Sequence, residues 1–248
     1  MSLTFRTYLS PIQNEFFRAT WDWLAAHSNL DLSLDQGHGS DEPDVVFMCG
    51  LPTGQKSDWY EPLVATVVAQ ERYGGRPIYF SDLVVRSGTA GPPNRSWRIA
   101  YNESQSFSGW VAPRWGLGVL GLEPGSMSWV ATGSHLGSME AVKKGDAEAA
   151  GVDSMILDLV SGEVAPAAGL VTIESFGPWP APPISTAVDM DRAVRAELFD
   201  SLTSMHEDPA GVHLLATWGV ERLTAVDAAE YARLAHFAET TASEGLGE

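Results

Sequence analysis

The stretch Arg98–Trp110, RIAYNESQSFSGW, begins with residues typical of a buried strand and then changes abruptly to hydroxyl side chains. Three serines stand at alternate positions, at Ser104, Ser106 and Ser108, and Gly109 follows them. Serine is a preferred residue at the beginning of a helix, where its oxygen accepts a backbone N–H hydrogen bond. The sequence therefore predicts a strand over Trp97–Tyr101 that leads through the serines into a helix.

The same order, a strand followed by a helix, occurs twice more after this stretch. Ser128–Thr132 reads as a strand, and Gly133-Ser134-His135 then begins a helix that ends near Gly145. Ala149–Asp153 reads as a second strand, followed by a helix over Ser154–Ser161. Alternating strands and helices are typical of α/β folds.

The remainder of the chain adds elements on both sides of this middle part. Ser10-Pro11 places a cap residue before a proline at the first helical position. The other expected elements are strands at Thr4–Leu9, Leu30–Leu34, Asp44–Met48, Leu63–Gln70, Pro77–Arg86 and Leu170–Phe176, and helices at Pro11–His27, Asp189–Glu207, Pro209–Thr217 and Asp227–Thr240.

This order of elements predicts two α/β lobes, each a mixed sheet flanked by helices. Residues 1–79 and 182–248 would form the first lobe, and residues 80–181 the second. The chain would cross between the lobes near residues 78–83 and again near 173–183. Two crossing strands would make a hinge, with a cleft facing the carboxyl ends of the strands.

Composition narrows the class of partner. The net charge of −17, from 15 basic and 32 acidic residues, argues against nucleic acid, whose binding depends on Lys and Arg. Cys49 is the only cysteine, so neither an intrachain disulfide nor a cysteine-built metal site is expected, and no cofactor is indicated. No apolar run approaches the roughly 18–20 residues of a membrane span, so membrane insertion is not expected.

Three blocks of the sequence resemble one known family. AYNESQSFSGW, GSHLGSMEAVKKGDAEAAGVDS and MHEDPAGVHLLATWG, the last followed by Tyr231, are similar to motifs of the phosphonate-binding (PhnD-like) solute-binding proteins of ABC transporters. The resemblance spans roughly residues 98 to 231. It implies the type II periplasmic binding protein fold, in which two lobes close over a ligand, and an ABC transporter permease as a partner.

The serine-rich turn is the first candidate ligand site. Free N–H groups and the positive end of a helix dipole favour an anion at a helix start, and the hydroxyls of Ser104, Ser106 and Ser108 add donors. Gly109 would supply a backbone N–H. The family pattern there is Ser-Thr-Ser-Gly, and Phe107 replaces its threonine, which removes a donor and adds an aromatic ring. The alternative for these serines is helix capping, which needs only one of them.

Three further residues are candidates at other strand ends. His135 stands where the family has a histidine, with hydrogen bonding to an oxyanion as its expected role. Asp153 ends a short apolar strand; it either caps the next helix or accepts a ligand amine or hydroxyl, and both roles are compatible. Ser10 begins the first helix and is the first-lobe candidate. No catalytic or metal-ligating residue is assigned.

Two functions of different classes follow. The first is a solute-binding protein that clamps a small polar, anionic, phosphonate- or phosphate-like ligand between its lobes. The second is a cytoplasmic enzyme or sensor with the same fold, of the thiamine-pyrimidine or menaquinone-pathway type. The N-terminal MSLTFRTYLSPIQ lacks the basic-then-apolar form of a signal peptide. The family resemblance indicates a periplasmic or extracellular location, whereas a native start at this methionine would indicate the cytoplasm.

Overall fold

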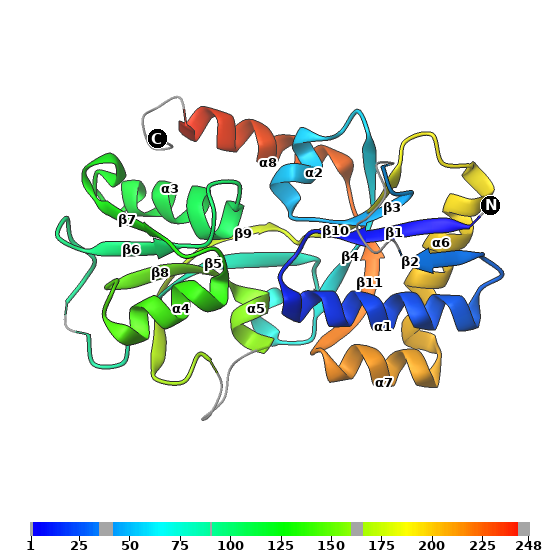
Figure 1. The fold of residues 1–248 in the computed structure, drawn as a ribbon, viewed down its shortest axis with the longest axis horizontal. Helices are drawn as coiled ribbons and strands as arrows, with labels where there is room; N and C mark the ends of the chain where they lie inside the picture. The colour runs from blue at the N-terminus through cyan, green and yellow to red at the C-terminus, as the bar shows by residue number, and fades with distance from the viewer. Residues whose placement is uncertain (1, 35–41, 90, 160–165, 243–248) are drawn as a thin grey trace. The chain divides into compact units, whose positions relative to one another are not determined.

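Two mixed β-sheets form the framework of the protein (Figure 1). The computed structural model describes residues 2–34, 42–89, 91–159 and 166–242. Residue contacts group the chain into two units: unit 1 consists of the residues up to Ile78 together with Pro180–Arg233, and unit 2 consists of Tyr79–Trp179 together with the residues from Leu234 onward. The predicted α/β class, with two mixed sheets flanked by helices, is confirmed.

The sheet of unit 1 has six strands in the order β11-β4-β10-β3-β1-β2. Strand β1 pairs in parallel with β2 and β3, whereas β10 runs antiparallel to both β3 and β4, and β11 runs antiparallel to β4. The strands are β1 (Leu3–Thr7), β2 (Leu32–Leu34), β3 (Val45–Phe47), β4 (Tyr60–Val68), β10 (Pro183–Ala187) and β11 (Val220–Ala225).

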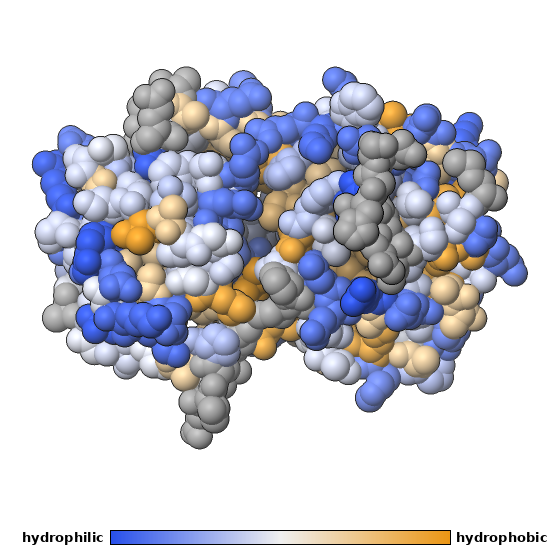
Figure 2. All heavy atoms as spheres, viewed as in Figure 1, coloured by the Kyte–Doolittle hydropathy of each residue, from blue (hydrophilic) through white to orange (hydrophobic). Residues whose placement is uncertain are grey.

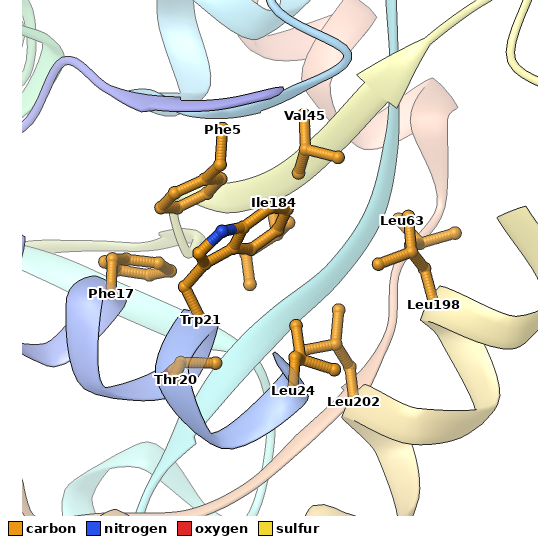
Figure 3. Close-up of a pocket in the computed structure, with 10 residues that line it drawn as sticks. All are labelled: Phe5, Phe17, Thr20, Trp21, Leu24, Val45, Leu63, Ile184, Leu198 and Leu202. Carbon is orange, nitrogen blue, oxygen red and sulfur yellow. The ribbon is translucent and has the colours of Figure 1, made fainter. Parts of the chain in front are cut away.

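Helix α1 (Pro11–His27) covers one face of this sheet through its aromatic side chains. The indole of Trp21 stacks on the ring of Phe5 from β1, with ring centroids 4.5 Å apart. Figure 3 shows these two rings beside Leu24 and Leu63, around a cavity of about 10 Å³. That volume is close to the minimum for one water molecule, so it is a packing defect rather than a ligand pocket.

Two further helices of unit 1 begin at a capping aspartate. Helix α6 (Arg192–Ser204) begins at Asp191, whose carboxylate accepts the N–H groups of Ala193 and Val194. Helix α7 (Pro209–Thr217) begins at Asp208 in the same way, with proline at its first position. A short helix, α2 (Gly50–Gln55), follows β3.

The sheet of unit 2 has five strands in the order β7-β6-β8-β5-β9. Strands β6 (Arg98–Tyr101), β7 (Ser128–Ala131) and β8 (Ala149–Asp153) run parallel, with β6 in the middle, and β5 (Ile78–Arg86) runs antiparallel to β8. Strand β9 (Leu170–Pro180) lies at the edge next to β5. Figure 1 shows helices α3 (Ala112–Val119) and α4 (His135–Lys144) on opposite faces of these strands.

The structure differs from the sequence predictions in several individual elements. The proline-rich segment after Phe176 is strand rather than connection, because β9 continues to Pro180 and β10 begins at Pro183. Strand β11 and helix α2 were not predicted. The helix expected over residues 154–161 is α5 (Ser154–Leu159), and its last two predicted residues lie outside the described residues.

The last helix, α8 (Ala228–Thr241), belongs to both units. The predicted lobes, residues 1–79 with 182–248 and residues 80–181, stay a prediction; residue contacts group the part of α8 from Leu234 with unit 2. The reason is aromatic packing: the ring of Phe237 lies 5.1 Å from that of Trp179 and 5.5 Å from that of Trp115, both in unit 2.

Candidate functional site

Three strand-to-helix connections of unit 2 leave the sheet at the carboxyl ends of parallel strands. One follows β6 and contains the serines; one follows β7 and leads to His135, the first residue of α4; the third is direct, because β8 ends at Asp153 and α5 begins at Ser154. Because β6, β7 and β8 run parallel and adjacent, these connections emerge at the same edge of the sheet. Binding sites of α/β proteins occur at this edge.

The loop after β6 ends in a capped helix start. Ser106 has an extended backbone, and its Oγ accepts a hydrogen bond of 3.0 Å from the N–H of Gly109. The chain then forms a five-residue π-helical turn (Phe107–Val111) that continues into α3. The hydroxyl hydrogen of Ser106 remains available, because a serine oxygen that accepts a hydrogen bond can still donate one.

Gly109 is required by a close approach. A Cβ atom at this position would overlap the amide group of Asn102 and would lie 3.2 Å from Ser106 Oγ. The Oδ1 atom of Asn102 is buried and makes no hydrogen bond with the described residues. Asn102 therefore lies against the helix start, a placement that the sequence analysis did not identify.

The loop after β7 brings His135 to the serines. Ser134 caps α4 by accepting the N–H of Gly137 at 2.9 Å, and His135 is the first residue of the helix. The Nε2 atom of His135 lies 3.3 Å from Ser108 Oγ, and both side chains are buried. The structure thus joins two residues that are 27 positions apart in sequence, through the starts of two different helices.

Burial keeps the imidazole of His135 neutral. Burial lowers the pKa of His135 to about 4, and the backbone of Gly151 opposes this effect only partly. The Nδ1 atom is buried and makes no hydrogen bond with the described residues. A neutral imidazole can donate from one nitrogen and accept at the other, so it can serve as a hydrogen-bond donor without formal charge.

Strand β8 ends at a buried carboxyl group, that of Asp153. Oδ1 of Asp153 accepts the N–H of Met155 at 2.8 Å and that of Ile156 at 3.4 Å, so Asp153 caps α5. Burial raises the pKa of Asp153 to about 7; the two N–H groups lower it, and the charges of Asp82 and Asp158 raise it further. These hydrogen bonds match the capping role, and the ligand-binding role stays a prediction.

The remaining predicted residues lie elsewhere. Ser104 is exposed in the turn before the helix. Phe107 is 1% exposed and its ring packs edge-on against Trp179 at 4.8 Å. Ser10 precedes α1 in unit 1, and its hydroxyl lies 3.3 Å from Gln13 Oε1. Hydrogen bonds and close contacts link four of the predicted residues, Ser106, Ser108, Gly109 and His135, into one cluster.

Two other buried side chains next to this cluster were not predicted. Ser81 in β5 donates to the carbonyl oxygen of Ser108 at 2.6 Å. The guanidinium of Arg114 in α3 lies over the rings of Trp110, at 4.3 Å, and Trp129, at 5.0 Å, and its burial lowers its pKa. Neither residue belongs to a sequence motif, because their partners are distant along the chain or are ordinary aromatic residues.

Within residues 2–34, 42–89, 91–159 and 166–242, His, Cys, Asp and Glu side chains nowhere gather in threes suitable for a metal ion. None of the helices in these ranges combines the length and hydrophobicity needed to cross a membrane.

The fold defines the class of protein, namely that of the type II periplasmic binding proteins. Residues 33–231 match the family described as "ABC transporter, phosphonate, periplasmic substrate-binding protein", and the chain belongs to this family. The resemblance found in the sequence is therefore confirmed. Membership implies a small-molecule ligand and a transporter as partner.

Solved structures with the same fold include two phosphonate-binding proteins. A binding protein component of an ABC phosphonate transporter from Pseudomonas aeruginosa has a TM-score of 0.79 and 17% identity, covering 98% of this chain and 88% of its own. PhnD1 from Prochlorococcus marinus, in complex with methylphosphonate, has a TM-score of 0.78 and 13% identity, covering 97% of this chain and 98% of its own.

A third similar structure comes from Xanthomonas citri and contains a bound chloride ion. Its TM-score is 0.71 at 15% identity, covering 98% of this chain and 99% of its own. At such identities the likeness establishes the fold and not the ligand. No curated protein sequence matches this chain significantly.

Proposed function

We propose that this protein binds a small oxyanion of the phosphonate or phosphate type for an ABC transporter, with the head group held at the edge of the unit 2 sheet. Ser106, Ser108 and His135 would supply the donors, and Asp153 would accept a hydrogen bond from another part of the ligand. Gly109, whose own N–H is bonded to Ser106 Oγ, would keep this helix start free of a side chain. Ser104, which is exposed in the turn before the helix, and Ser10, which lies in unit 1, are not part of this proposed site.

One observation carries this proposal: the hydroxyl of Ser108 and the imidazole of His135 meet at 3.3 Å where two helices begin. Helix starts present N–H groups and the positive end of the helix dipole, which together favour an anion. Ser106 needs only its oxygen for capping. A structural serine at position 108 would not need a buried histidine beside it.

Phe107 changes what the site can offer. The ring packs into an aromatic group with Trp179 and Phe237 instead of presenting a polar atom. Compared with the threonine of the family pattern, one donor is missing. A head group bound here therefore relies on the serines, the imidazole and the backbone N–H groups.

The test is a thermal-shift screen of the purified protein with methylphosphonate, aminoethylphosphonate, phosphate, phosphite and a sulfonate. A ligand at a hundredfold its dissociation constant adds about 2.7 kcal/mol, and each kcal/mol raises the melting temperature of a chain of this size by roughly 2–4 °C. We expect a shift with at least one phosphorus oxyanion. No shift with any oxyanion, together with a shift with a pyrimidine precursor, would favour the enzyme or sensor instead.

Site variants locate the binding. Ser108→Ala should abolish the shift, because it removes the hydroxyl beside His135 without touching the cap at Ser106. Ser104→Ala is the matched control, since Ser104 is exposed in the same turn. Loss of binding in both variants, or in neither, would contradict the placement of the site.

A further inference from the structure

The peptide group between Ser108 and Gly109 lies in a chain of hydrogen bonds that begins outside the ligand loops. The hydroxyl of Ser81 donates to its carbonyl oxygen at 2.6 Å. The N–H of the same peptide group, which belongs to Gly109, donates to Ser106 Oγ at 3.0 Å. Ser81, one peptide group and Ser106 are thus connected in series.

This series of hydrogen bonds is buried along its whole length. The side chain of Ser81 is 0% exposed, and Ser106 and Ser108 are 2% and 4% exposed. A Cβ atom at residue 151 would lie 3.0 Å from the Ser108 carbonyl oxygen, so the backbone of Gly151 packs against the same atom. Water is kept away from this carbonyl, and the hydroxyl of Ser81 is its polar partner on this side.

The position of Ser81 in the sheet explains how it reaches this carbonyl. Ser81 lies directly opposite Asp153 in the pairing of β5 with β8, and paired residues point to the same face of a sheet. The π-helical turn of residues 107–111 packs against β8 from that face. A small hydroxyl side chain therefore bridges from β5 to the turn.

Hydrogen bonds in series strengthen one another, because each polarises the next. Donation from Ser81 makes the Gly109 N–H a stronger donor to Ser106, and a serine oxygen that accepts a stronger bond donates its own hydrogen more readily.

We propose that Ser81 is a positioning residue of the oxyanion site, acting through the Ser108–Gly109 peptide group on the donor Ser106. This inference rests on the proposed function. Ser81 does not itself touch the ligand; it sets the donor strength of a residue that does.

The experiment measures dissociation constants by calorimetry for methylphosphonate and inorganic phosphate. Ser81→Ala should weaken the binding of the preferred probe roughly 3- to 10-fold, the range expected for losing one neutral hydrogen bond. Ser175→Ala is the matched control, because Ser175 donates a bond of similar length, 2.7 Å, to Asp82, the next residue of β5. It should lower stability without changing the dissociation constant.

A double-mutant cycle separates positioning from general loosening. If Ser81 acts through Ser106, the weakening of binding by Ser81→Ala should be smaller in the Ser106→Ala background, because the last acceptor of the hydrogen-bond series is then missing. Equal effects in both backgrounds would overturn the inference. So would equal weakening by Ser81→Ala and Ser175→Ala.

Other outcomes distinguish a failure of the proposed function from a failure of the proposed role of Ser81. If Ser81→Ala does not fold, Ser81→Cys keeps the volume with a weaker donor and should show the same weakening. If the wild-type protein binds neither these probes nor any other phosphorus oxyanion of the thermal-shift screen, the proposed function fails and this inference with it. If the wild type binds and Ser106→Ala weakens binding while Ser81→Ala does not, only the role of Ser81 fails.

Discussion

Asp153 and His135 are both buried in unit 2, and burial shifts their pKa values in opposite directions. The pKa of Asp153 rises from 3.8 to about 7, and that of His135 falls from 6.5 to about 4. Between roughly pH 4 and pH 6.5 the folded protein therefore holds a neutral acid and a neutral imidazole. In the unfolded chain over the same range, the acid is ionised and the imidazole is protonated.

The two groups cancel in their effect on the pH dependence of stability. For Asp153 the folded state binds more protons, so its contribution to stability falls as the pH rises from about 4 to about 7. For His135 the unfolded state binds more protons, so its contribution rises as the pH rises from about 4 to 6.5. Each state binds one proton between the pair, and the slopes oppose each other.

Replacing either residue should reveal the pH dependence of stability that the other one contributes. We expect His135→Gln to become less stable as the pH rises from about 4 to 6.5, and Asp153→Asn to become more stable, each changing relative to wild type by up to about 1.4 kcal/mol per pH unit. Urea unfolding of the ligand-free variants at several pH values measures both. Parallel curves for both variants and wild type would show that these groups are not buried in the folded state.

At the scale of the element, the start of the helix after β6 depends on the pair Gly109 and Asn102. A methyl group at residue 109 would overlap the Asn102 side chain, whereas the backbone of Gly109 itself is not in the left-handed region. Gly109→Ala should therefore cost about 1–3 kcal/mol, the range of overpacking in a well-packed interior.

The loss of stability caused by Gly109→Ala should disappear when the side chain of Asn102 is shortened. In the Asn102→Ala background, which removes the overlapping amide, Gly109→Ala should have little effect on the free energy of unfolding. Chemical denaturation of the four proteins of this cycle measures the coupling. If Gly109→Ala is equally costly in both backgrounds, the helix start requires glycine for another reason.

Elements with a local signal could be predicted from the sequence, and those fixed by distant contacts could not. Helix α1 has its serine and proline at the start, and α4 has Ser134 before it and Gly145, at φ +85°, after it. Strand β10 lies between β3 and β4, with Ser185 and Thr186 fully buried, so it shows neither apolar alternation nor an apolar run. Its strand character comes from its neighbours.

The same distinction applies to the candidate site. Helix capping by Ser106 and Asp153 follows from local sequence, and parallel strands bring the β6 and β7 loops to one edge. Ser81 and Asn102 gave no signal, because a single serine in a strand and a single asparagine after one are common. Only the packed structure shows which carbonyl or glycine they contact.

At the scale of the whole molecule, the 32 acidic residues outnumber the 15 basic ones. Figure 2 shows hydrophilic residues over most of the visible face, with hydrophobic residues in smaller groups between them. The net charge is −17, so the long-range field around the protein repels anions. The donors proposed to hold an oxyanion are uncharged, and they act over hydrogen-bond distances only.

Because the net charge acts at long range and the hydrogen-bond donors act only at contact, we predict that salt changes the association rate of the ligand but not its dissociation rate. Added salt screens the net charge of −17 over roughly 10 Å at 0.1 M, while buried hydrogen bonds are screened much less. The association rate of methylphosphonate should therefore rise severalfold from about 0.01 M to 0.15 M sodium chloride, and the dissociation rate should stay nearly constant. Stopped-flow tryptophan fluorescence can follow both rates, with potassium acetate as a second salt to exclude competition by chloride. An association rate that falls with salt would mean that a local positive field, such as that of a guanidinium, guides the anion despite the overall charge.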